Sequence, residues 1–399
     1  NSRLEAERLV ADIGLTSPVN GVPSFDIDLN ATLTGKDFKA FLPQLASMTD
    51  PVDITVKGKT DNVGEIVLDA LNVHAPGNMI KMGMNGTILM DSSLNITGFK
   101  FAKAQGTFRD GMPAWLESQL EGFGIRIPDQ IKTLGNGDFK VSLNSDSKQD
   151  RIDSDLELNS LAGSLICKLN GNNGVYNGTV DAKNVNLHTI TGNSSLGNCT
   201  LSAQAQALKQ DKGFSGNFKG DIASLIYNKY DYRNIIVNGS FDSDMILSDL
   251  HFSDRNGTLS LNAGIGTGKD PFYRIGLNAD SLNLYAYHLT EKENMTMTVS
   301  MDADLSGKNA DEITGKISVD SLYYADISGD WFMDNFTVEI GELQDFVRII
   351  SVNSDFMNMS ITGHYNLSTL PGSLAKACGD VLPTIGNLVG TKLKAGKYN

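Results

Sequence analysis

The alternation of apolar and polar residues along nearly the whole chain is the feature that most constrains its fold. Residues 25–33 read Phe-Asp-Ile-Asp-Leu-Asn-Ala-Thr-Leu, and the same period of two recurs at 139–143, 259–265, 295–305 and 361–367. Successive side chains of a β-strand point to opposite faces, so this period predicts strands with one apolar and one polar face. About twenty such strands, separated by Asn-Gly, Gly-Lys and Asp-Gly turns, predict an all-β chain of antiparallel hairpins.

Helices that would cover the apolar faces are scarce. Apolar residues at helical spacing predict short amphipathic helices near 37–48 and 112–123, and a C-terminal helical segment at 370–399. These pieces are too few for the predicted sheet, so its apolar faces must cover each other or cover something that is not protein. We therefore expect residues 1–369 to form an elongated, curved antiparallel β-groove, an open taco-like repeat sheet.

The lining of this groove is predicted from the apolar positions of the alternating strands. A shift of one residue in register would exchange the two faces. Methionine is frequent among these positions, and its flexible thioether suits an adaptable lining. The predicted lining residues are Phe25, Ile27, Leu29, Met82, Met84, Leu201, Leu259, Leu261, Ile275, Leu277, Met295, Met297, Val299, Met301, Ile361 and Tyr365.

A weak internal repeat interrupts the alternation. Residues 68–73, 180–187, 277–284 and 317–324 each pass from an alternating strand into an Asp/Asn-x-Leu-like step. Such a step predicts that the strand bulges or changes face at this point. A repeat of a few strands also predicts units that stack along one axis.

Charge and cysteine content exclude several classes of function. The formal net charge of −14 is opposite to what nucleic-acid binding needs, and it predicts that any lipid contact runs through apolar side chains. The three cysteines, Cys167, Cys199 and Cys378, form no Cys-x-x-Cys pair. Cys167 alternates with Leu165 and Leu169, which indicates a buried structural thiol rather than a disulfide framework.

The motifs that resemble chemical sites are better explained as strands and turns. Residues 264–269 suggest a phosphate loop, but Ala263 and Asp270 break its pattern and a hairpin turn is expected. Residues 26–30 imitate the start of a calcium loop, but their spacing is that of a solvated strand face. The five histidines are scattered and lack zinc spacing. We therefore expect no catalytic residue, no metal site and no enzymatic activity.

Three stretches of the chain resemble strand and turn patterns of the TamB family, as found in Bacteroidetes-type bacteria within the wider AsmA-like group. One combines GFSGNFKGDI at 213–222 with YNKYDYRNI at 227–235 and a following Gly-x-Phe. A second is IPDQI at 127–131 followed by a Leu-Gly step. The third joins SDF at 354–356 to ITGHYNL at 361–367 and a Leu-Pro pair. The resemblance covers roughly residues 25 to 375.

The resemblance implies a function as well as a fold. TamB-like proteins form open apolar grooves that bridge the inner and outer membranes of Gram-negative bacteria. It implies intermembrane phospholipid transport or outer-membrane biogenesis in the periplasm, with bound phospholipid as cargo and no other cofactor. The implied partners are phospholipids, a TamA-like outer-membrane barrel of the Omp85 type, and the inner membrane. The family reaches the inner membrane through an N-terminal anchor, so we expect this chain to be a piece of a longer protein.

Two other readings of the same alternation stay open. A closed β-solenoid serving as a surface adhesin or carbohydrate-binding protein would also alternate, but would be dry inside and carry no lipid. A transmembrane β-barrel would alternate with its apolar face toward the membrane and would need detergent for extraction. The aromatic content of 8% and the interspersed helical patterns favour the groove over the barrel.

Overall fold

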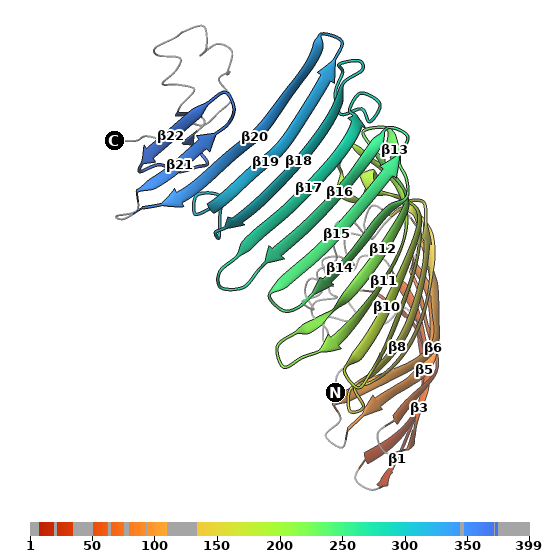
Figure 1. The fold of residues 1–399 in the computed structure, drawn as a ribbon. Coiled ribbons are helices and arrows are strands. Elements are labelled where there is room, and N and C mark those ends of the chain that lie inside the picture. The colour runs from red at the N-terminus through yellow and green to blue at the C-terminus, as the bar shows by residue number, and fades with distance from the viewer. Residues whose placement is uncertain are drawn as a thin grey trace. The chain divides into compact units, whose positions relative to one another are not determined.

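The chain is almost entirely β-sheet in the part of it that the structure describes. The computed structural model describes residues 8–19, 22–34, 51–62, 65–75, 80–91, 95–109, 134–343, 347–370 and 372–373. These residues hold 22 strands and a short helix at Leu187–Thr191 (Figure 1), and residues 370, 372 and 373 are also helical. The helices expected at 37–48 and 112–123, and nearly all of the segment expected at 370–399, lie outside the described residues.

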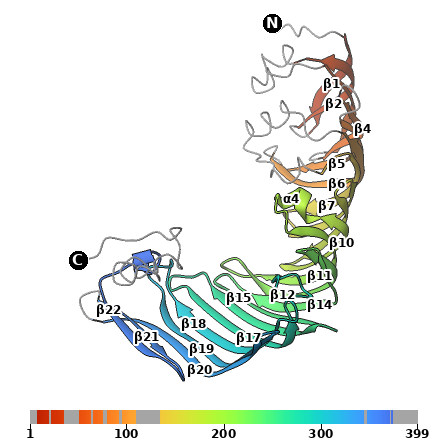
Figure 2. The ribbon, with the colours of Figure 1, turned by 90° about the horizontal axis from the view of Figure 1, so that it is seen from above.

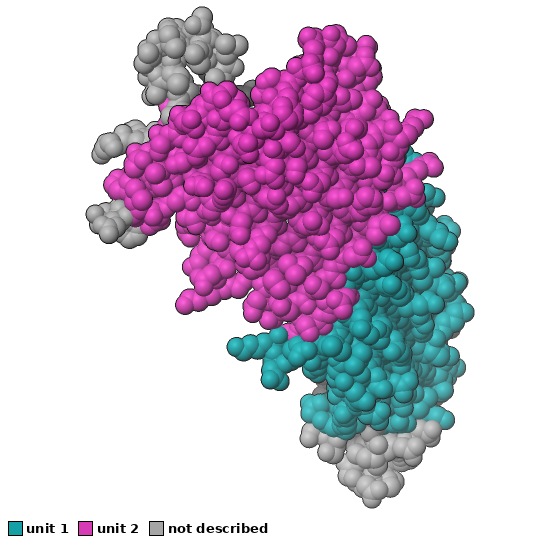
Figure 3. All heavy atoms as spheres, viewed as in Figure 1, with its two compact units in different colours: residues 1–212, 218–232 teal, residues 213–217, 233–399 magenta. Residues whose placement is uncertain are grey.

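The chain divides into two compact units, which Figure 3 colours separately. Unit 1 comprises residues 1–212 and 218–232, and unit 2 comprises residues 213–217 and 233–399. The strands up to β11 belong to unit 1, those from β14 onward belong to unit 2, and β12 has residues in both.

In unit 1, each strand from β1 to β11 pairs antiparallel with the next, and the end of β12 pairs with β13. The short helix α4 (Leu187–Thr191) follows β10. The strands are β1 (Arg8–Val19), β2 (Val22–Leu33), β3 (Val52–Asn62), β4 (Glu65–His74), β5 (Ile80–Met90), β6 (Ile96–Phe108), β7 (Gly137–Asp146), β8 (Arg151–Ser160), β9 (Gly163–Asn172), β10 (Val175–Asn186), β11 (Leu196–Lys209), β12 (Phe214–Tyr227) and β13 (Tyr230–Tyr232).

In unit 2, each strand from β14 to β22 pairs antiparallel with the next, and Figure 2 shows them as a curved single layer. The strands are β14 (Ile235–Phe241), β15 (Met245–Asp254), β16 (Gly257–Gly266), β17 (Phe272–Asn283), β18 (Thr296–Ser306), β19 (Thr314–Asp326), β20 (Gly329–Glu342), β21 (Arg348–Asn353) and β22 (Asn358–Gly363). The predicted all-β antiparallel architecture is therefore confirmed.

The strand register carries one apolar face across each unit, because residues paired across two strands point to the same face. In unit 1, one line of paired residues runs from β2 to β11 through Leu29, Val56, Leu71, Met84, Ala104, Val141, Leu156, Cys167, Val180 and Ala203. In unit 2, the corresponding line runs from β14 to β20 through Val237, Leu250, Leu261, Leu277, Met301, Val319 and Phe336.

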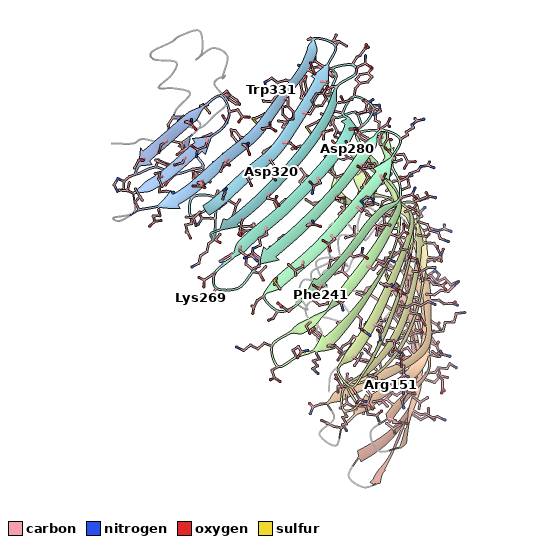
Figure 4. All side chains as sticks on the ribbon, in the orientation of Figure 1. Arg151, Phe241, Lys269, Asp280, Asp320 and Trp331 are labelled. Carbon is pink, nitrogen blue, oxygen red and sulfur yellow. The ribbon has the colours of Figure 1, made fainter. Side chains whose placement is uncertain are left out.

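The internal repeat is a repeated β-bulge, as the sequence predicted. In β10, Ala182 and Val185 are three residues apart but oppose two residues of β11 that are two apart. The same register shift occurs at 68–71 in β4 and at 279–282 in β17, and β19 carries one extra residue, Asp320, against β18 (Figure 4). Each bulge compensates for the break in alternation, so the apolar residues on both sides of it share one face.

Two of these bulges share their detailed geometry. Asn184 and Ser281 have φ values of 50° and 53°, in the left-handed region. The backbone N–H of Asn184 donates to Thr200 Oγ1 at 3.1 Å, and that of Ser281 donates to Thr298 Oγ1 at 2.9 Å. Each bulge is therefore held by a threonine on the next strand.

An asparagine follows each of these two bulges and caps the turn after the strand. Asn186 Oδ1 accepts from the backbone N–H of Thr189 and starts α4, while Asn283 Oδ1 accepts from that of Ala286, both at 2.9 Å. The sequence similarity between 180–187 and 277–284 therefore reflects a shared strand–bulge–cap unit, once in unit 1 and once in unit 2.

Candidate functional site

On the polar face of the sheet, side chains form ion pairs and hydrogen bonds with one another. In unit 1, Lys57 forms an ion pair with Asp28 at 2.8 Å, and Lys140 with Glu157 at 2.9 Å. These hydrogen-bonded partners raise the pKa of both lysines. The residues that imitate a calcium loop lie here, where Asn30 accepts a hydrogen bond from Thr55, so the expected solvated strand face is confirmed.

The opposite, apolar face carries the predicted lining residues. Their side chains are mostly half-buried, which is the state of apolar residues with neighbours on either side but no second layer above. The backbone of Phe25 lies in β2, but its side chain is outside the described set. Residues of the predicted lining that are half-buried are Ile27, Leu29, Met82, Met84, Leu201, Leu259, Leu261, Leu277, Met295, Met297, Val299, Met301 and Ile361.

Three predicted lining residues depart from the common arrangement. Ile275 lies between Ala263 and Ala303 on the apolar face and is exposed. Met295 precedes β18, and its carbonyl accepts a hydrogen bond from the Leu284 N–H at 2.8 Å.

Tyr365 is the third, and it follows β22 instead of lying within a strand. It is buried, and its hydroxyl donates to the Ile361 carbonyl at 3.2 Å. The structure therefore gathers the predicted residues along the apolar faces of the two units, but not as identical sites.

Described protein covers this face only near the ends of some strands. In unit 2, Tyr287 from the turn after β17 is fully buried and packs edge-on against Phe252, with 5.8 Å between ring centroids. Its hydroxyl donates to Asp254 at 2.7 Å. In unit 1, α4 packs beside β11.

Within each unit the described strands form a single layer, and most of the apolar residues named above are only half-buried. The apolar face is therefore available to a molecule other than described protein.

Open hollows lie mainly over the polar face. One of about 620 Å³ in unit 1 is lined by polar side chains such as Asn72, His74 and Lys140. Another of about 580 Å³ in unit 2 is lined by Asp249, Arg274 and others. Of the predicted groove lining, only Met82 and Ile275 line these two hollows.

Two thiols lie on the apolar face of unit 1. Cys167 is half-buried and Cys199 is buried, and both are free. Loss of solvent raises the pKa of each thiol, which keeps them protonated at neutral pH. Cys167 was expected to be buried and is only half-buried, and Cys378 lies outside the described residues.

A buried arginine on the apolar face of unit 2 was not predicted from the sequence. Arg348 is only 7% exposed, and its guanidinium donates to the carbonyls of Asp311 and Ile313. Its Nε is buried without a hydrogen-bond partner. The sequence could have indicated its position, because Arg348, Ile350 and Val352 are every second residue of β21 and therefore share one face.

Arg348 also stabilises the charge of a neighbouring carboxylate. The Asp311 carboxylate accepts hydrogen bonds from the Ser368 N–H at 2.8 Å and hydroxyl at 3.0 Å. These bonds, with a contribution from the Arg348 charge, lower the pKa of Asp311. The group joins the turn before β19 to the segment after β22.

The described residues show no group of three His, Cys, Asp or Glu side chains placed to hold a metal ion. Nor is any helix in the described ranges long and apolar enough to cross a membrane. Comparison with models of known protein families, with curated proteins and with solved structures gives no match.

Proposed function

We propose that this chain binds phospholipid along the apolar faces of its sheet and carries it between membranes, as a TamB-like bridge would. One observation supports this proposal most strongly. Within each unit, paired apolar residues continue from strand to strand, and no second layer of described protein covers them.

The gain from covering such a surface is large enough to hold a lipid tail. Burying about ten methylene groups contributes roughly 8 kcal/mol before the cost of immobilising the lipid. The polar head group would remain in water beside the sheet. Because the apolar line consists of similar aliphatic positions, many weak sites of similar affinity would let a tail slide.

The chemistry of the lining suits a cargo without one fixed shape. Met84, Met297 and Met301 lie on the apolar faces, and methionine adapts to irregular neighbours. The polar face, by contrast, is rich in short polar side chains and ion pairs that need no ligand. Lipid tails are therefore proposed for the apolar face alone.

The resemblance to TamB proteins supplies the rest of the proposal. By that resemblance the chain would lie in the periplasm between the inner and outer membranes, with a TamA-like barrel of the Omp85 type as its partner at the outer membrane. Lipid transfer or outer-membrane biogenesis would be the biological role.

Two substitutions of nearly equal exposure test the binding face. Ile275 on the apolar face is 37% exposed, and Leu247 on the polar face is 40% exposed. Aspartate at position 275 would place a charge where lipid tails are proposed, whereas aspartate at position 247 would join Ser240 and Gly264 on the polar face.

The measurement is mass spectrometry of an organic extract of each purified protein, with a matched soluble protein as control. We expect phospholipid in stoichiometric amount with the native chain and with Leu247→Asp, and a several-fold loss with Ile275→Asp. Circular dichroism would show that each variant retains its strands. Absence of lipid above the control from the folded native chain would refute the proposal.

A further inference from the structure

The hairpin formed by β19 and β20 is apolar on both faces near its turn. Tyr324 pairs with Trp331 on the apolar face, and Tyr323 pairs with Phe332 on the opposite face. Ile327, in the turn itself, is 78% exposed. We call these five residues the aromatic tip, and Figure 4 labels Trp331 within it.

The second apolar face is confined to the tip. Farther along the same two strands, Lys316 pairs with Glu339 and Ser318 with Thr337 on the face that carries Phe332 near the turn. If only one face of these strands were apolar, the residues on the other face would stay polar up to the turn. The aromatic side chains on the polar side of the tip therefore need a separate explanation.

The tip is exposed to solvent and extends onto a neighbouring turn. Trp331 and Phe332 are exposed, and so is Phe356, whose ring centroid lies 6.4 Å from that of Trp331. The backbone N–H of Asp334 donates to the carboxylate of Asp355 at 2.9 Å, which holds the neighbouring turn beside β20.

We propose that the aromatic tip inserts into the interfacial layer of a zwitterionic lipid bilayer. A protein partner would cover one side of the hairpin, whereas a bilayer surrounds an inserted tip on both faces. Tryptophan and tyrosine favour this layer because their rings are apolar and their polar groups can stay hydrated. The Tyr324 hydroxyl donates to Asp326 at 2.7 Å, so its polar end is already satisfied near the turn.

The charges around the tip select the kind of bilayer. Asp326, Asp330, Asp334 and Asp355 lie on or beside the hairpin, and Lys292 forms an ion pair with Asp326 at 3.8 Å. An anionic surface repels such a group. The docking surface therefore fits a bilayer whose lipids carry no net charge.

The position of the tip connects bilayer docking with the proposed cargo path. Tyr324 pairs with Met297 of β18 on the apolar face, so that face leads directly into the tip. A lipid that leaves the bilayer at the tip would meet the apolar face first. Docking goes beyond the proposed function, because vesicle binding needs no bound cargo.

Tryptophan fluorescence tests the docking directly. The chain has two tryptophans, so Trp115→Phe leaves Trp331 as the single reporter. We expect zwitterionic phosphatidylcholine vesicles with brominated acyl chains to quench Trp331 fluorescence and shift its emission to shorter wavelength. Vesicles that contain anionic phosphatidylglycerol should bind several-fold more weakly.

A matched pair of substitutions controls this test and serves even if Trp115→Phe fails to fold. Ile327→Asp changes the tip, and Leu161→Asp changes the β8–β9 turn, where Leu161 is 79% exposed. In sedimentation with phosphatidylcholine vesicles, Ile327→Asp should weaken binding at least tenfold while Leu161→Asp leaves it unchanged. Equal binding of both variants, or no binding by the folded native chain, would overturn the inference.

The two proposals fail separately. Co-purified phospholipid without vesicle binding would refute docking alone, whereas vesicle binding by a chain that carries no phospholipid would refute the cargo function alone. Stronger binding to anionic vesicles would also overturn the inference, because it would show that the acidic residues do not govern the contact.

Discussion

The two faces of the sheet in unit 2 differ in how their side chains are satisfied. On the polar face, Arg274 reaches Asp304 at 3.5 Å, and Lys316 reaches Glu339 at 3.7 Å, with all four side chains more than half exposed. On the apolar face, aliphatic side chains such as Leu277 and Met301 pair across strands and have no second layer of described protein above them. The side chains of the polar face are satisfied by water and by one another. Covering the apolar face with any apolar group would be favourable, because it removes apolar surface from water.

This difference shows how a single-layer sheet can be stable without a conventional core. Cross-strand pairs and nearest-neighbour strand contacts stabilise each part of the sheet locally, as in other repeat proteins. The apolar face that no described protein covers is the surface on which we propose that lipid binds.

The largest loss of stability is expected from substitution of a glycine that packs against a bulge of the apolar face. Gly257 and Gly329 have nearly equal φ values of 140° and 143°. A Cβ at 257 would lie 2.8 Å from Leu282 Cα, whereas one at 329 would meet nothing within 4 Å. We expect Gly329→Ala to cost about 1–3 kcal/mol through backbone strain. Gly257→Ala should cost roughly 1–3 kcal/mol more through overpacking.

Urea unfolding followed by circular dichroism measures both glycine variants, and the difference between them isolates the packing against the bulge. Equal midpoints for the two variants would show that the bulge does not need this close approach.

The next prediction compares one arginine on each face. Arg348→Met leaves two carbonyls without their donor and should destabilise unit 2 by about 1–3 kcal/mol. Arg274→Met removes an exposed ion pair with Asp304 and the contact of the guanidinium with the Phe272 ring, 4.9 Å from its centroid, and should cost about 1 kcal/mol or less. Chemical denaturation of the two variants measures both losses of stability. A larger loss with Arg274→Met than with Arg348→Met would contradict this prediction.

A smaller effect is expected from pH. The pKa of Asp311 is lowered in the folded chain, mainly by the two hydrogen bonds from Ser368. A lowered folded-state pKa contributes stability above the unfolded pKa, and this contribution is lost as pH falls below about 4. Asp311→Asn should therefore flatten the acid side of the stability curve, and an unchanged pH dependence would contradict the assignment.

The sequence predicted the strands and the apolar face because both follow from one period of two. It also predicted the bulges, since a step of three between apolar residues such as Leu68 and Leu71 requires an extra residue. The left-handed conformation of Ser281 could not be predicted from the sequence, because serine has no strong preference for it. Its cause lies in a tertiary contact, the hydrogen bond to Thr298.

The aromatic tip and the buried Arg348 were missed for different reasons. Tyr323 and Phe332 look like ordinary strand residues until the register shows that they share the otherwise polar face. Arg348 has the parity of a core position, but its burial depends on the turn that carries Asp311 and Ile313, which is distant in sequence. Sequence alternation assigns faces, whereas exposure at a strand end depends on neighbouring turns.

Photo-crosslinking at one position on each face would show directly which face of the sheet carries lipid. The photoreactive residue p-benzoylphenylalanine would replace Leu277 on the apolar face or Leu247 on the polar face, and mass spectrometry would identify adducts after irradiation in the producing cells. We expect a phospholipid adduct at position 277 and none at position 247. Equal adducts at both positions, or an adduct at position 247 alone, would contradict the claim that the apolar face carries lipid.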